Sequence, residues 1–288
     1  MTIKKLSFYG LITSIISIIA GAIVRATGSG DGCGSSWPTC NGKVIPELKN
    51  TSELIEFSHR AISGILLIIT IAIFIKSFND KTPVNWRRLI WLLTFFVILE
   101  ALIGGVIVIY EWVGLNSSIP RIIAVPLHLV NTFGLLGSYT LLFYLTKNSK
   151  TNINNFYDRG FKTALILFLL TGATGSITAL ADVLFPSETF IIGLSEDFDP
   201  SSELLTRLRI LHPIVASVLS LYLYSEANRL EKEHRIFSRN IKALVLLGVC
   251  LGILNVFSNI ILILSILHLL IADLLWITYI YKVAEKIK

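Results

Sequence analysis

Long apolar runs dominate the chain, and they recur with the length and spacing typical of membrane-spanning helices. A helix of about 20 apolar residues crosses a bilayer. Such a helix satisfies its own backbone hydrogen bonds, so it is stable in lipid. The pattern predicts eight spans, at residues 6–24, 53–76, 88–109, 122–146, 162–181, 204–226, 240–258 and 262–282.

Two of these spans need a separate argument. The first, 6–24, follows two lysines and resembles a signal peptide, but no clear small-residue cleavage site follows it, so we interpret it as a retained helix. The apolar run is nearly continuous between the last two spans. We separate them at the turn-prone residues Asn255, Ser258 and Asn259.

Composition and charge agree with a membrane protein. Only 15% of the residues are charged and the mean hydropathy is +0.72, whereas soluble proteins carry about 25% charged residues. Lysine and arginine gather at both ends and in alternate connecting segments, while segment 182–203 is acidic. Because basic segments stay on the cytoplasmic side, both termini are expected to face the cytoplasm from the cell membrane. The sequence has no basic tract with interleaved aromatic residues, which is the pattern that would indicate a nucleic-acid partner.

The chain also has the marks of an internal duplication. Residues 25–30 (RATGSG) are echoed by residues 171–176 (TGATGS), and each half contains four spans. We therefore predict an all-α membrane protein of two pseudo-symmetric four-helix bundles. The N-terminal half is 1–150 and the C-terminal half is 151–288.

Four histidines are the strongest chemical signal. His59, His128, His212 and His268 lie one on each even-numbered span, five to eight residues after its start, and so at one depth in the outer half of the membrane. The fifth, His234, lies in a basic loop. Polar side chains at such a depth need a partner. Facing histidines on neighbouring helices suit the axial positions of a haem, and bundle cores commonly hold such cofactors. We expect the pairs His59 with His128 and His212 with His268.

The two halves differ three residues before the first histidine of each pair. Glu56 precedes His59 and shares its helix face, whereas Arg209 precedes His212. A carboxylate beside a haem can move protons or stabilise a cation, although an acid also suits a helix N-terminus. An arginine suits a haem propionate. We therefore expect an active site in the N-terminal half and an electron-carrying haem in the C-terminal half. Further candidate propionate contacts, which interface anchoring also explains, are Arg25, Arg60 and Arg121.

Three cysteines and one more acid remain. Cys33 and Cys40 lie in a loop on the oxidising side, where a disulfide is expected, either as a loop staple or as a redox relay. Cys250 is interpreted as a small buried apolar residue. Glu100, within a span, is either part of a proton path or a polar partner inside the bundle.

Together these residues resemble the haem A synthase family. The resemblance covers nearly the whole chain and rests on Val24-Arg25, Thr27-Gly28-Ser29-Gly30, Cys33, Trp37-Pro38, Cys40, Gly42, Glu56-x-x-His59-Arg60 and the other three span histidines. It implies an enzyme of two four-helix halves that converts haem O into haem A by oxidising a ring methyl to a formyl group. It also implies that His59 and His128 flank the substrate, that Glu56 is catalytic, that His212 and His268 bind haem b, and that Cys33 and Cys40 are the family's outer-loop pair.

One departure from the family and two other functions are to be weighed. Segment 182–203 has no cysteines, whereas many bacterial members carry a second pair there, so a relay of two cysteine pairs is excluded. The alternatives are a bis-histidine cytochrome b that only transfers electrons and a proton-coupled transporter. Beyond haem O and a membrane electron donor, the candidate partners are haem O synthase, the terminal oxidase assembly and a second copy of the chain.

Overall fold

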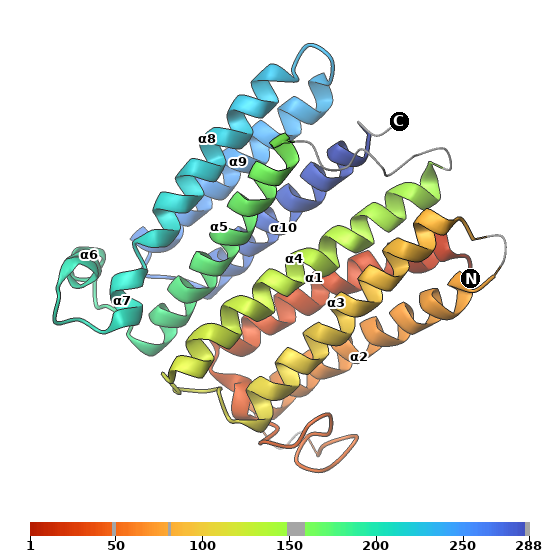
Figure 1. The fold of residues 1–288 in the computed structure, drawn as a ribbon. Helices are drawn as coiled ribbons and strands as arrows, with labels where there is room; N and C mark the ends of the chain where they lie inside the picture. The colour runs from red at the N-terminus through yellow and green to blue at the C-terminus, as the bar shows by residue number, and fades with distance from the viewer. Residues whose placement is uncertain (48–49, 80–81, 149–158, 286–288) are drawn as a thin grey trace. The chain divides into compact units, whose positions relative to one another are not determined.

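The computed structural model describes residues 1–47, 50–79, 82–148 and 159–285 (Figure 1). Apart from one isolated bridge between Cys40 and Lys43, the regular elements in these ranges are helices, which confirms the predicted all-α class. They are α1 (Ile3–Ala26), η1 (Ser29–Asp31), α2 (Thr51–Ser77), α3 (Val84–Ile109), α4 (Ile119–Lys147), α5 (Arg159–Leu184), α6 (Phe190–Phe198), α7 (Leu204–Leu208), α8 (Leu211–Arg229), α9 (Arg235–Phe257) and α10 (Leu262–Glu285).

Eight helical stretches among the described residues are long and apolar enough to cross a membrane, which confirms the predicted spans. Seven are single helices, and α7 and α8 together form the remaining one. Large apolar side chains such as Ile68, Leu221 and Leu246 are exposed along these helices. Lipid covers such faces at no cost, so the chain is a multi-pass membrane protein.

Local signals explain where two helices begin and end. Asn50 caps α2, because its side-chain oxygen accepts a hydrogen bond from the Glu53 amide at 2.7 Å, and α2 therefore starts two residues before the predicted span. The predicted turn between the last two spans is also confirmed. The chain leaves α9 through Asn259, whose φ is +57°, a left-handed conformation that asparagine tolerates better than most residues.

The predicted span 204–226 is interrupted between α7 and α8, at Arg209 and Ile210. Pro213 lacks an amide hydrogen, and its ring crowds the carbonyl four residues earlier, which is that of Arg209. That carbonyl accepts instead from the Thr178 hydroxyl of α5 at 3.2 Å and from the His212 amide at 3.2 Å. The break thus positions an arginine and a histidine at the start of α8.

A short helix, α6, lies in the segment that the sequence suggested only as an acidic loop. Thr189 caps it by accepting from the Ile192 amide at 3.3 Å. Its apolar side chains at Ile191, Leu194 and Phe198 are exposed. Nine residues are too few to span a membrane, and the hydropathy pattern of spans therefore did not predict it.

Contacts divide the chain into two compact units. Unit 1 contains α1, η1, α2, α3, most of α4 from Val130, and the end of α10 from Ile280. Unit 2 contains Leu115–Leu129, α5 to α9, and α10 as far as Tyr279. The boundary predicted between the halves, at residues 150 and 151, lies outside the described residues. The division into two pseudo-symmetric halves stays a prediction.

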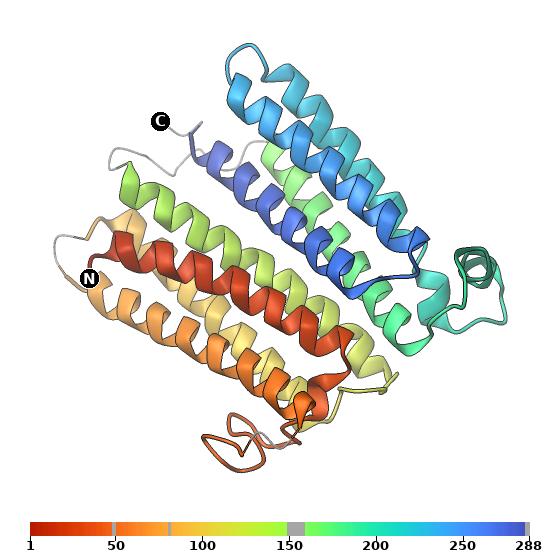
Figure 2. The ribbon, with the colours of Figure 1, turned by 180° about the vertical axis from the view of Figure 1, so that it is seen from behind.

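Close helix contacts build the core of each unit. In unit 1, α1 to α4 run alongside one another (Figures 1 and 2), and the buried Tyr139 hydroxyl of α4 is 2.7 Å from the Thr70 hydroxyl of α2. The Tyr139 ring lies directly against Gly10 of α1. In unit 2, the ring of Phe168 on α5 meets that of Trp276 on α10, with centroids 4.8 Å apart.

The prediction for Cys250 is wrong. Its thiol is free and its side chain is exposed on α9, not buried. Hydropathy alone does not say which face of an all-apolar helix meets protein and which meets lipid.

We predict that Gly10→Ala destabilises unit 1 by about 1–3 kcal/mol, as overpacking does in a filled core. A β-carbon at Gly10 would lie 2.1 Å from Tyr139 Cε1, and the hydrogen bond to Thr70 keeps that ring in place. Thermal unfolding in detergent checks this. Gly64→Ala is the control, because a β-carbon there meets nothing within 4 Å. Equal midpoints for the two variants would contradict the packing argument.

Candidate functional site

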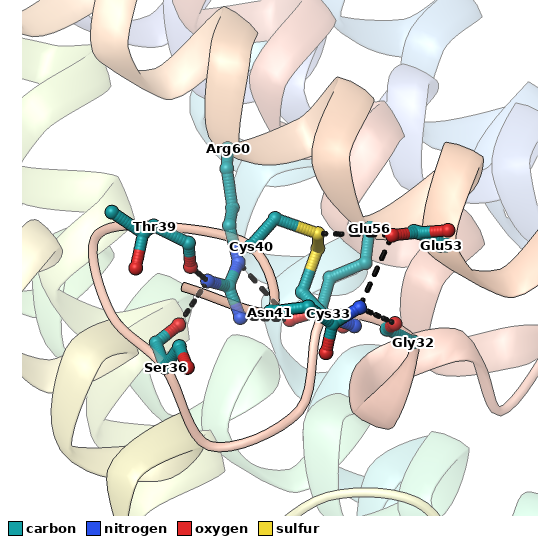
Figure 3. A network of polar contacts seen from close by, with 9 residues as sticks. All are labelled: Gly32, Cys33, Ser36, Thr39, Cys40, Asn41, Glu53, Glu56 and Arg60. Carbon is teal, nitrogen blue, oxygen red and sulfur yellow. Dashed lines mark hydrogen bonds and ion pairs between the residues drawn. A yellow bond between two sulfur atoms is a disulfide. The ribbon is translucent and has the colours of Figure 1, made fainter. Parts of the chain in front are cut away.

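The first turns of α2 carry a buried carboxylate that binds the cysteine loop (Figure 3). Glu56 is 3% exposed, and its Oε2 accepts a hydrogen bond from the Cys33 amide at 2.7 Å. Its Oε1 accepts from Arg60 Nε at 3.1 Å and forms an ion pair with the same guanidinium. Both carboxylate oxygens are therefore engaged by this chain.

Arg60 connects α2 to the cysteine loop. Its Nη1 donates to the carbonyl oxygens of Ser36 and Thr39, while its other nitrogens face Glu56. A guanidinium has five donors in a planar fork, and here most of them are directed at protein acceptors. The structure thus places this candidate propionate contact within the loop network (Figure 3).

The cysteine loop is closed by the predicted disulfide, and it packs on α3. Cys33 and Cys40 are bonded, both are buried, and the Asn41 amide donates to the Cys33 carbonyl at 2.9 Å. The Trp37 ring lies against the backbone of α3 at Gly105, where a β-carbon would be 2.9 Å from Cδ2. The loop covers the ends of α2 and α3, as a staple would require.

His59 lies on α2 one turn after Glu56, and its ring leans on α1. A β-carbon at Gly21 would be only 3.1 Å from His59 Cε1. His128 lies on α4, two residues after Pro126, the proline inside that helix. The pairing of His59 with His128 stays a prediction.

Glu100 is resolved in favour of a polar partner inside the bundle. Its two oxygens accept from the Asn131 amide and the Thr132 hydroxyl, each at 2.5 Å, and Asn131 also donates to the Phe96 carbonyl at 2.8 Å. These α4 residues follow His128 by three and four positions. Glu100 therefore ties α3 to the helical turn that follows this histidine.

In unit 2 the structure brings His212 and His268 together. Their ring centroids are 6.2 Å apart and the ring planes are perpendicular, at 88°. An iron bound in line at about 2.0 Å to one nitrogen of each ring would separate the centroids by roughly 6.2 Å, since a ring centre lies about 1.1 Å behind its nitrogen. The pair therefore fits the axial positions of a haem, and the separation also suits an edge-on ring contact.

Arg209, three residues before His212, is the centre of an ionic cluster. It is 7% exposed, its Nε donates to Asp197 at 2.8 Å, and its terminal nitrogens lie 3.3 Å from Glu196 and 3.5 Å from Asp182. Burial raises the pKa of the Asp197 carboxyl above its ordinary value, against the lowering effect of the adjacent guanidinium. Like Arg60, this candidate propionate contact is bound by protein groups, and it ties α6 and the end of α5 to α8.

The other two predicted arginines lie elsewhere. Arg25 is half-buried in the last turn of α1, and Arg121 is buried in the first turn of α4, where it donates to the Asn116 carbonyl at 2.6 Å. Within the described parts of the chain, histidine, cysteine and acidic side chains form no group of three or more that could hold a metal ion. Tetrahedral zinc requires three or four such ligands, whereas a haem requires only two.

The sequence alone did not identify the acids around Arg209, the partners of Glu56 or the glycines beside the histidine rings. Asp182 and Asp197 were seen only as part of an acidic segment. The Arg209-Ile-Leu-His212-Pro213 stretch signals only the break before α8, because the proline removes a helical hydrogen bond from the Arg209 carbonyl, and it gives no sign of the acids.

Comparisons with known proteins give one family and several relatives. The model of a family described as cytochrome oxidase assembly protein (COX15-CtaA) matches residues 4–280. A protoheme IX farnesyltransferase of Thermus thermophilus is 32% identical over 282 residues, which cover 94% of this chain and 46% of that protein. Heme A synthases of Exiguobacterium sp. and Staphylococcus epidermidis are 38% and 36% identical over 112 residues, about 38% of this chain and 37% of each of those proteins.

The chain therefore spans about half the length of the Thermus proteins it matches. More than half of the Thermus farnesyltransferase lies outside the match, so the farnesyltransferase name describes that protein and not this chain. The two heme A synthases match a shorter part of this chain.

We predict that Arg209→Gln detaches α6, because three acids would lose their counter-charge in a partly buried setting. Breaking such a pair typically costs about 3–5 kcal/mol. Limited proteolysis within residues 186–203 should become much faster than in the wild type. The double variant Arg209→Gln with Asp197→Asn should recover part of the resistance, since it removes one uncompensated charge. Unchanged cleavage in the single variant would show that the cluster does not hold the helix.

Proposed function

Because the chain belongs to the cytochrome oxidase assembly protein family (COX15-CtaA), we propose that it is a haem A synthase, which oxidises a methyl group of haem O to the formyl group of haem A. The similarity to two named heme A synthases supports this activity. The observation that carries the proposal is the His212–His268 pair, whose 6.2 Å ring separation suits one iron. A protein of this family needs such a site if it is to carry electrons to its substrate.

In this proposal, His212 and His268 hold haem b, and that group supplies one-electron transfer when bound. His59 and His128 flank the haem O substrate, which is the site proposed for the N-terminal half. An apolar bundle suits both ligands, because a prenylated porphyrin partitions into lipid.

We assign Glu56 to the reaction as the carboxylate beside the substrate. The Cys33 amide and Arg60 orient its two oxygens, and 3% exposure excludes most water from it. A fixed, dry carboxylate can stabilise positive charge that develops on a neighbouring carbon, or accept a proton from it. Arg60 and the disulfide loop act as positioning groups for Glu56, and Cys33 and Cys40 serve as the staple of that loop. Arg25, Arg60, Arg121 and Arg209 are the proposed propionate contacts.

We further propose that the histidines and the cysteine loop lie toward the outer face of the cell membrane, because the basic segments lie at the opposite helix ends. One relative that contains a region like this chain is named a farnesyltransferase. This name supports a direct supply of prenylated haem to this chain. Haem O synthase and the terminal oxidase assembly are then the partners upstream and downstream, and a second copy of the chain is a candidate partner.

Replacing His268 by Ala should abolish the low-spin haem b spectrum of the purified protein. One of the two proposed axial ligands would be lost, and His212 alone would remain of the pair. Visible spectra and haem-to-protein ratios check this. If the spectrum is unchanged, His268 is not an axial ligand. A colourless wild-type protein would favour a transporter.

Glu56→Gln should keep haem b but lower haem A formation by about 10²–10⁴-fold, the range that positioned acid–base groups contribute. The assay is co-expression with a haem O producer, followed by mass analysis of the extracted haems. Glu53→Gln is the matched control, since Glu53 is also buried on α2 but binds the Asn41 side chain, at 3.1 Å. Equal losses in both variants would argue against a special role for Glu56. A wild type that keeps haem b but never forms haem A would favour an electron-transfer cytochrome.

A further inference from the structure

Three of the four span histidines share one contact that the sequence did not reveal. Each imidazole lies edge-on against a glycine of a neighbouring helix: His59 against Gly21 of α1, His212 against Gly175 of α5, and His268 against Gly252 of α9. We propose that Gly175 and Gly252 are positioning residues that orient the two imidazoles toward their shared iron, and that Gly21 does the same for His59. This inference rests on the proposed function.

The same atom of the ring makes the contact each time. A β-carbon built on Gly175 would lie 2.9 Å from His212 Cε1, one on Gly21 would lie 3.1 Å from His59 Cε1, and one on Gly252 would lie 3.2 Å from His268 Cε1. Ordinary van der Waals contact begins near 3.4 Å. A β-carbon at Gly175 would force a shift, and at Gly21 and Gly252 the ring would have to give by a few tenths of an ångström.

This close approach is selective. A β-carbon on Gly64 of α2 would meet nothing within 4 Å, and one on Gly248 of α9 would make an ordinary contact of 3.6 Å with Ile271. Other close glycines, such as Gly10 and Gly134, face the phenyl or phenol rings that fill the core of unit 1. Only some of the glycines in these helices therefore lie beside a ring. In three of these cases the ring belongs to a histidine.

A backbone carbonyl of α9 also determines which nitrogen of His268 is left for a metal. One turn before Gly252 on α9, the Gly248 carbonyl lies 3.0 Å from His268 Nδ1. A carbonyl only accepts, so Nδ1 carries the hydrogen, and in a neutral ring Nε2 then holds the lone pair. The helix backbone thus fixes both the tautomer and the rotation of the ring, as outer-sphere partners of metal-bound histidines do.

The arrangement across unit 2 follows from these two contacts. α5 supports the His212 ring and α9 supports the His268 ring, and the two rings face each other with centroids 6.2 Å apart. A displacement of either ring by a few tenths of an ångström would change the distance or the angle at which its nitrogen meets the iron. The ligand field is therefore sensitive to one methyl group on either supporting helix.

The test compares Gly175→Ala and Gly252→Ala with two controls in the full-length protein carrying its haem. Gly64→Ala adds the same methyl group in open space, and Cys250→Ala changes an exposed side chain two residues from Gly252 on the same helix. The readouts are haem b per protein, the low-spin electron paramagnetic resonance signal and the midpoint potential. Size-exclusion profiles report on folding.

Gly175→Ala, at the tightest contact, should weaken haem retention by about tenfold or more, in the range of outer-sphere changes at metal sites. Gly252→Ala should keep more haem but shift the resonance signal and the midpoint potential. Both controls should match the wild type. If both glycine variants also match the wild type, the inference fails. If the wild type shows no low-spin haem that His268→Ala removes, the proposed function fails instead. If Gly175→Ala does not fold, Gly252→Ala alone decides.

Discussion

An imidazole inside a membrane-spanning helix has to be supported by a neighbouring helix, because lipid offers it no hydrogen bond. In this chain the rings of His59, His212 and His268 pack against the bare backbone of a glycine, and the Gly248 carbonyl lies within hydrogen-bond distance of His268 Nδ1. The demand on packing is severe. α1 must approach α2, α5 must approach α8, and α9 must approach α10 closely enough for a ring edge to touch the backbone. Helix packing and the positions of the three imidazoles are thus one constraint in these helix pairs.

A second regularity concerns the arginines beside the histidines. Arg60 follows His59 by one residue and holds the disulfide loop, while Arg209 precedes His212 by three residues and holds α6. In both units a guanidinium, partly buried at Arg60 and buried at Arg209, ties a segment outside the spans to the helix that carries a histidine. A planar fork with five donors can serve several acceptors at once, which a lysine cannot do with the same geometry.

The two arginines differ in the number of acids that surround them. Next to His59, one carboxylate faces one guanidinium, and a backbone amide completes the set. Next to His212, one guanidinium faces three acids, and the cluster lies toward α6. The first arrangement fixes a single carboxylate in a dry site, as an active site requires. The second is a structural clasp that holds α6.

The sequence by itself determined the eight spans, the turn at Asn259, the disulfide and the placement of one histidine on each even span. These features are local, since span length, turn propensity and loop position depend on neighbours in the chain. Only the tertiary structure decided where Arg60, Arg209 and Glu100 send their polar atoms, and that Cys250 faces outward. It also decided that glycines lie against the histidine rings. Those facts depend on residues distant in sequence, and an apolar run carries no record of which helix lies beside it.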